Sequence, residues 1–232
     1  MHKGNADIVQ LAAILGRTPS SIAMKLCNFA SLDPAHQLRN VRGLRNASRG
    51  DKAIYEEFSQ DWEQLAFESE QARQRIFEQQ LSPPITIIDD FPIPEGPTER
   101  TLLVRARTVQ SFFRNAVFAA YEYSCAICEI RIAAMLNASH IIPRSREVRR
   151  RADPTNGIAL CALHDRAFDR GLVGIDDDFR VVISDKLRVQ NPSTIHRVGL
   201  IEIHGKSVTL PHRFHPDRMA IEFHRREIFD AA

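Results

Sequence analysis

The sequence lacks the features of membrane-spanning and secreted proteins. No apolar run approaches the ~18–20 residues needed to span a bilayer. Residues 1–5 lack the apolar stretch of a signal peptide. Four cysteines in 232 residues are too few for a disulfide scaffold. Internal repeats and low-complexity tracts are also missing. We therefore expect a cytoplasmic protein without a membrane partner, and its length allows one large domain or two small ones.

An excess of charge of one sign is also lacking, because 31 basic residues nearly balance 29 acidic ones and the net charge is only +2. Its distribution is uneven, however: residues 100–151 hold ten Arg against three Glu, and a second basic run holds Arg39, Arg42, Arg45, Arg49 and Lys52. Between the two runs, residues 53–80 carry seven acids and two Arg. Blocks of this kind can put a positive, phosphate-binding surface on a nearly neutral protein. Either run alone could equally be a solvated helix face or a loop.

Residues 7–29 predict two helices separated by a turn. Apolar residues recur at helical spacing up to Gly16, and Thr18-Pro19 then reads as an N-cap followed by proline at the first helical position. The small, turn and core residues fall where a helix-turn-helix needs them. This arrangement would leave Ser20, Ser21 and Lys25 facing outward toward DNA. A plain helical hairpin fits the same pattern.

A proline-rich stretch predicts the domain boundary. One long helix is expected over residues 51–80, and five prolines follow within residues 82–98. We therefore predict a helical, possibly DNA-binding domain over residues 1–81, a linker over 82–99 and a second domain over 100–232.

The second domain predicts a mixture of helices and strands, which makes the whole chain α+β. Apolar spacing predicts a helix through residues 109–120, short strands over 139–143 and 155–160, and a helix over 163–170 ended by Gly171. Alternating residues at 181–183 and 200–203 predict a further strand pair packed on this core.

Two cysteine-containing pairs predict a structural zinc site. Cys125 and Cys128, then Cys161 and His164, form two C-x2-[CH] knuckles that together fill four tetrahedral positions. A closed site of this kind staples two distant segments. The alternatives are reduced, buried cysteines with chance spacing, or a site of three cysteines with His164 given to a second metal.

The segments Ala138–Pro143, Asp153–Leu160 and Leu160–Gly171 resemble the HNH endonucleases, in particular the bacterial HNH restriction endonucleases. The resemblance extends upstream to Arg107-x-x-Gln110-x-x-Phe113-Arg114 and downstream to Glu222–Arg225. The opening segments Leu15–Pro19 and Ser31–Pro34 also resemble the leader of that branch, so the resemblance covers most of the chain. It implies a ββα-metal nuclease domain, in which a His, an Asn and a metal ligand lie on two strands and a helix.

The resemblance assigns a role to individual residues. His140 is expected to be the general base, and Asn156 to brace the loop and orient it. Asp165 takes the position of the metal ligand on the helix, with Asp169 one turn further on the same face. Ser139 is placed at the Mg²⁺ or Mn²⁺ ion, at the position where many relatives carry a carboxylate or His ligand, but serine is a poor ligand. Binding of the ion would therefore depend on Asp165 and Asp169, or on a more distant residue such as His224.

The sequence thus predicts a metal-dependent endonuclease acting on double-stranded DNA, in restriction or defence against foreign DNA. One site per chain suggests a homodimer. Expected phosphate contacts are the loop arginines and two helix arginines: Arg144, Arg146, Arg149, Arg150, Arg151, Arg166 and Arg170. The alternatives are a zinc-stabilised DNA-binding module with an inactive HNH site, and a nuclease that acts on RNA or only nicks.

Overall fold

A computed structural model of the chain describes residues 2–38, 47–80 and 97–232. The chain divides into two compact units, residues 1–105 and 106–232, with separate apolar clusters in the helical N-terminal part and in the second unit. The expected linker over residues 82–99 lies outside the described residues up to position 96, as do Arg39, Arg42 and Arg45. None of the helices in the described parts of the chain combines the length and apolar character needed to cross a bilayer.

The first unit opens with the two predicted helices, α1 (Ala6–Ile14) and α2 (Pro19–Leu32). Gly16 adopts a φ of +59° after α1, a conformation that glycine reaches without steric cost. The Thr18 hydroxyl accepts a hydrogen bond from Ser21 N and caps α2. The hairpin prediction is therefore confirmed, whereas its use in reading DNA stays a prediction.

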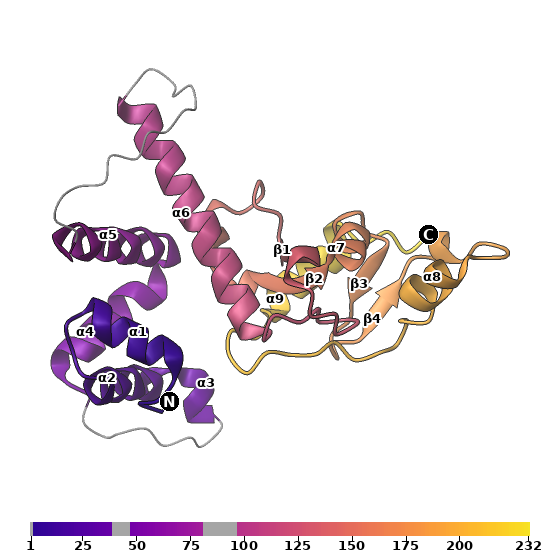
Figure 1. Ribbon diagram of the computed structural model, residues 1–232. Coiled ribbons are helices and arrows are strands. Elements are labelled where there is room, and N and C mark those ends of the chain that lie inside the picture. Colours follow the sequence, from indigo (N-terminus) through magenta and orange to yellow (C-terminus); the bar gives the residue numbers. More distant parts are fainter. Residues whose placement is uncertain (1, 39–46, 81–96) are drawn as a thin grey trace. The chain divides into compact units, whose positions relative to one another are not determined.

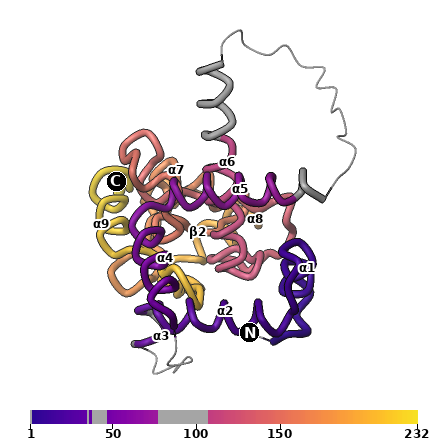
Figure 2. The backbone as a smooth tube through the Cα atoms, turned by 90° about the vertical axis from the view of Figure 1, so that its left-hand side faces the viewer, coloured from indigo at the N-terminus to yellow at the C-terminus, as the bar shows by residue number. Residues whose placement is uncertain are grey.

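The single helix expected over residues 51–80 is wrong. The structure has a short α3 (Pro34–Leu38), then α4 (Arg49–Gln60) and α5 (Trp62–Gln80), which run in different directions on either side of Asp61 (Figure 2). Asp61 leaves the helical region with φ −135° and ψ 90°, and its carboxylate accepts from Gln64 N at 2.9 Å. An Asp that caps the next helix therefore ends the previous one without glycine or proline.

The second unit is built around a β-hairpin with helices against it (Figure 1). Strand β1 (Leu136–His140) pairs antiparallel with β2 (Gly157–Cys161), and His140 lies opposite Gly157. Helix α6 (Pro97–Ala120) precedes the hairpin and α7 (Ala162–Asp169) follows it directly. The predicted order of strand, strand and helix is confirmed, although β1 covers residues 136–140 where the prediction placed a strand over 139–143.

The tail forms differently from the prediction. Strand β4 (Val181–Ile183) pairs with β3 (Val173–Ile175) and not with residues 200–203. Residues 200 and 201 end the π-helical turn Arg197–Ile201, which continues α8 (Thr194–His196), and residues 202 and 203 lie in the turn that follows. In this segment only Ile203 is buried, so the alternating pattern does not mark a strand face. Helix α9 (Arg218–Glu227) completes the unit.

Candidate metal and catalytic centre

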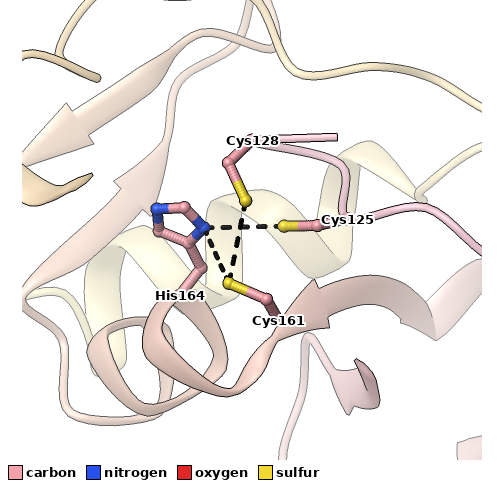
Figure 3. A group of neighbouring side chains, drawn as sticks. All are labelled: Cys125, Cys128, Cys161 and His164. Carbon is pink, nitrogen blue, oxygen red and sulfur yellow. Dashed lines mark hydrogen bonds between the residues drawn. The ribbon is translucent and has the colours of Figure 1, made fainter. Parts of the chain in front are cut away.

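Three sulfur atoms and one ring nitrogen converge at a buried point of the second unit (Figure 3). Cys125 and Cys128 come from the turn after α6, Cys161 ends β2, and His164 lies in the first turn of α7. Their ligand atoms all lie within 4.8 Å of one another. The two predicted knuckles are thus brought together.

The spacing of these atoms fits a tetrahedral zinc ion. The Zn–S distance of ~2.3 Å and the Zn–N distance of ~2.0–2.1 Å imply about 3.8 Å between two sulfurs and about 3.5 Å between sulfur and nitrogen. The Cys128 and Cys161 sulfurs are 3.8 Å apart. His164 Nδ1 lies 3.5 Å from Cys125 Sγ and 3.3 Å from Cys161 Sγ. Three of the distances between donor atoms therefore match those of a tetrahedral zinc site, and the donor set could hold this ion.

The imidazole of His164 is oriented by a hydrogen bond on its far side. His164 Nε2 lies 2.9 Å from the Gly199 carbonyl oxygen and donates to it. In a neutral ring this leaves Nδ1, the atom that faces the sulfurs, without a proton. His164 is 1% exposed, so both of its nitrogens are committed. This geometry favours the four-ligand cluster over the alternative in which His164 serves a second metal.

A hydrogen bond between two cysteine side chains of the cluster shifts their pKa values in opposite directions. A hydrogen bond from the Cys161 thiol lowers the pKa of Cys125 to about 3. The same contact with Cys125 raises the pKa of Cys161, and burial adds to the rise. A thiolate is the form that binds metal, so Cys125 is poised as a ligand.

A separate cavity of about 410 Å³ lies between α6, β1, α7 and the loop after β1. It is lined by His140, Ser139, Asp165 and Asp169, together with cationic and polar side chains of α6 and of the loop after β1. The remaining lining residues are Gln110, Phe113, Arg114, Asn137, Ala138, Pro143, Arg144 and Arg151. The residues expected to carry catalysis thus share one cavity, apart from Asn156, which is not among its lining residues.

His140 is held by a ring on one side and by a carbonyl at its edge. Its imidazole stacks on Phe113 with ring centroids 3.8 Å apart and planes 10° apart. Its Nε2 lies 3.0 Å from the Arg151 carbonyl oxygen, so Nε2–H donates and Nδ1 is the proton acceptor. Burial lowers the pKa of His140, and the charges of Arg144 and Arg151 lower it further. The ring is therefore neutral near pH 7, as a general base requires.

Asn156 fixes the loop that carries this carbonyl. It is 1% exposed, and its Oδ1 accepts from Ile142 N at 2.8 Å while its Nδ2 donates to Ile142 O at 3.0 Å. A longer contact of 3.5 Å joins Nδ2 to Arg150 O. Its contacts are therefore those of a loop brace and not those of a group that meets substrate.

Asp165 is oriented by two side chains of β1. Its Oδ2 accepts from Asn137 Nδ2 at 2.6 Å, and its Oδ1 accepts from the Ser139 hydroxyl. Residues two apart on a strand share a face, which explains why both reach α7. The pKa of Asp169 is raised, because protein atoms partly desolvate its carboxyl and because the Asp165 carboxylate is near. Two carboxylates in one cavity could hold a divalent cation through oxygen.

His224 is not part of this cavity. It is 2% exposed, stacks on Phe168 with ring centroids 3.6 Å apart, and has its Nε2 3.1 Å from the Phe168 carbonyl oxygen. Its ring belongs to the packing of α9 on α7. The suggestion that His224 supplies a distant metal ligand is therefore wrong.

The loop arginines differ in their availability. Arg150 is paired with Asp153 at 3.0 Å and with Asp217 at 2.8 Å, so it closes the loop and is not assigned to phosphate. Arg151 donates through Nε to the Arg144 carbonyl. Arg146 and Arg149 are exposed.

Other predicted DNA contacts lie on exposed surfaces. Arg166 and Arg170 are exposed on α7 and at its end. In the first unit Ser20, Ser21 and Lys25 are exposed, as expected of an outward face. Lys25, however, pairs with Asp51 at 2.7 Å and thereby ties α2 to α4. The charge of Lys25 is therefore partly neutralised by Asp51.

Sequence reasoning missed three contributors to the site: Asn137, Arg114 and Phe113. Asn137 could have been found, because it lies two residues before Ser139 and so shares its strand face. Phe113 and Arg114 were part of the quoted upstream motif, but nothing local indicates that α6 lies against His140.

Part of the chain is similar to known proteins. Residues 125–176 match a family described as HNH endonuclease. The matched segment contains all four ligands of the cluster together with the carboxylates and His140. No curated protein matches the chain. Among solved structures, one described as "Modification dependent TagI restriction endonuclease" is similar over 50% of this chain and 37% of its own, with 22% identity and a TM-score of 0.33.

Proposed function

We propose that this chain, whose residues 125–176 belong to the HNH endonuclease family, is a metal-dependent endonuclease that hydrolyses duplex DNA. The observation that carries the proposal is the shared cavity: a neutral imidazole, two carboxylates and several arginines face the same space. That combination suits attack of water on a phosphodiester.

His140 is the general base in this proposal. Its Nε2–H is held by the Arg151 carbonyl, so Nδ1 takes the proton of the attacking water. Stacking on Phe113 keeps the ring plane fixed. Asn156 holds the loop between β1 and β2 through Ile142. It thereby keeps in place the Arg151 carbonyl, which selects this tautomer of His140.

Asp165 and Asp169 are the residues that would hold the Mg²⁺ or Mn²⁺ ion. When bound, such an ion polarises the scissile phosphate and stabilises the departing 3′ oxygen. Ser139 and Asn137 orient the Asp165 carboxylate through hydrogen bonds. Ser139 therefore contributes through Asp165, which accounts for a site without a carboxylate at position 139.

The four-ligand cluster would hold a structural Zn²⁺ ion. His164 belongs to this cluster and Asp165 to the cavity, so neighbouring residues of α7 serve two sites. The biological role that we propose is restriction or defence against foreign DNA, as the sequence resemblance implies. Cutting both strands with one cavity per chain calls for a homodimer.

Incubation of the purified protein with modified and unmodified plasmid DNA tests the proposal. We expect Mg²⁺- or Mn²⁺-dependent cleavage, visible when the products are sized, and its loss in His140→Ala. Binding of DNA should survive this substitution, because His140 lies within the cavity and carries no charge near pH 7. Binding without cleavage by the unaltered protein would instead support a DNA-binding module with an inactive site.

A further inference from the structure

One face of α6 carries side chains that the proposed mechanism does not yet use. Arg107, Gln110 and Arg114 follow one another at spacings of three and four residues, so they share a face of the helix. All three are exposed. Gln110 and Arg114 line the cavity beside His140, whereas Arg107 lies one to two turns away from it along the helix. We call these three residues the α6 face.

The α6 face is held in place by the packing of the adjacent face. Phe113 and Val117 are 2% and 1% exposed and pack toward the β-hairpin. A Cβ at Gly157 would lie 2.4 Å from Val117 Cγ2 and 2.9 Å from Phe113 Cζ, so the helix approaches β2 as closely as its atoms allow. Because Phe113 also stacks on His140, its neighbour Arg114 is fixed relative to the base.

The charges of the α6 face are available. Within the described part of the chain, neither Arg107 nor Arg114 forms an ion pair. The Arg114 guanidinium lies 4.7 Å from the centroid of the Phe118 ring, a stacking contact that orients it but leaves its N–H groups for another partner. Arg150, by contrast, is neutralised by two aspartates.

We propose that the α6 face binds the phosphate backbone of duplex DNA beside the scissile bond, with Arg114 on the phosphate nearest His140. The inference rests on the proposed nuclease function. Guanidinium groups bind phosphate oxygens in bidentate fashion, and the Gln110 amide adds a neutral donor. Arg107 and Arg114 are about 10 Å apart along the helix. Successive phosphates of one strand advance ~3.4 Å along the duplex axis, so the two arginines contact different phosphates.

The test is the salt dependence of DNA binding in a His140→Ala background, which prevents cleavage. Arg114→Gln and Arg107→Gln should each make the slope of log K against log[salt] shallower by about 0.9, the value for one lost phosphate contact. Arg114→Lys should keep the slope, because the charge remains. The control Arg226→Gln removes an arginine that is 69% exposed on α9, outside the cavity, and should leave the slope unchanged.

Cleavage by protein with His140 intact separates the two arginines. Arg114→Gln should lower kcat/KM about tenfold to a hundredfold, because it borders the reacting phosphate. Arg107→Gln should weaken binding and leave kcat unaltered. If both glutamine variants keep the parental slope, the inference is overturned while the nuclease function stands. If the unaltered protein neither binds nor cuts DNA, the proposed function itself fails, and preferential binding of RNA would overturn the assignment to duplex DNA.

Discussion

At the scale of single residues, His224 shows how burial controls a titratable group. Its ring is enclosed between α7 and α9, and burial lowers its pKa to about 4 although the Phe168 carbonyl opposes the shift. In an unfolded chain the same ring takes up a proton near pH 6.5. Between these two pKa values the unfolded state binds more protons than the folded state. The contribution of His224 to the free energy of unfolding is therefore fully present above about pH 6.5 and is lost as the pH falls toward 4.

This linkage predicts a measurable effect. Lowering the pH from 7 to 5 should cost about 2 kcal/mol of unfolding free energy through His224 alone. His224→Gln keeps a donor for the Phe168 carbonyl but does not titrate, so denaturant unfolding of this variant should lose about 2 kcal/mol less over the same interval. The exposed His204→Gln serves as the control and should behave like the unaltered protein. Equal pH dependence in all three proteins would contradict the prediction.

Adjacent residues of α7 should give opposite phenotypes. Asp165→Ala removes a carboxylate of the cavity and should abolish metal-dependent cleavage while the protein stays folded and keeps zinc. His164→Ala removes a buried ligand and should release zinc and lower the unfolding temperature. Elemental analysis, thermal unfolding and a cleavage assay on both variants test this. A folded, zinc-containing but inactive His164→Ala, beside a normally active Asp165→Ala, would mean that the two roles are reversed.

Residue identities in the site were predictable to the extent that they depend on local spacing. Cys125, Cys128, Cys161 and His164 were found because each knuckle is complete within four residues. The ion pair of Arg150 with Asp217 joins residues 67 positions apart, and no local pattern indicates it. Arg150 was therefore grouped with its unpaired neighbours, although it closes the loop that they extend.

At the scale of elements, the contact between α6 and β2 depends on one missing side chain. Gly157→Ala would put a methyl group 2.4 Å from Val117 Cγ2 within a buried interface. We expect a loss of about 1–3 kcal/mol from overpacking, and reduced cleavage because displacement of Phe113 releases the His140 ring.

The matched control for this substitution is Gly205→Ala, in the same unit. Gly205 has a φ of +75° and no atom within 4 Å of a built Cβ, so an alanine there would introduce backbone strain without a clash. It should cost about 1 kcal/mol and leave cleavage intact. Comparison of unfolding free energy and kcat/KM for the two variants separates damage to the site from damage to stability. Full activity in Gly157→Ala would contradict the coupling of α6 to the base.

Elements whose ends are marked by glycine were predicted, and elements without such a marker were not. Gly16 and Gly171 both take positive φ at helix ends, and both ends were placed correctly. The end of α4 at Asp61 was missed, because a capping aspartate is weaker evidence than glycine or proline. Strand β3 was missed because three residues containing Gly174 carry too little pattern, and its pairing with β4 is decided by the surrounding core.

At the scale of the whole molecule, the chain contains two units with separate apolar clusters. The described cluster of the first unit is small, comprising Ile8, Ala12, Ile22, Ala23 and the partly buried Leu26. The second unit has a larger core and the four-ligand cluster, which also reaches residues 197–201 through the His164–Gly199 hydrogen bond. A metal bound there would hold the turn after α6, the end of β2, α7 and this segment together.

The final prediction therefore concerns metal content and unfolding together. Protein prepared without chelator should contain about one zinc ion per chain by elemental analysis, because the four ligands form a closed tetrahedral set. Removal of zinc should lower the stability of residues 106–232, since metal binding and folding are coupled. It should not alter the unfolding of the first unit, in which none of the four ligands lies.

Hydrogen exchange followed with and without a strong chelator measures both units in one experiment. Loss of protection in α7 and β2, with α1 and α2 unchanged, is the expected result. Uniform loss along the chain would show that the units do not fold independently, and unchanged protection in α7 would show that the cluster needs no metal.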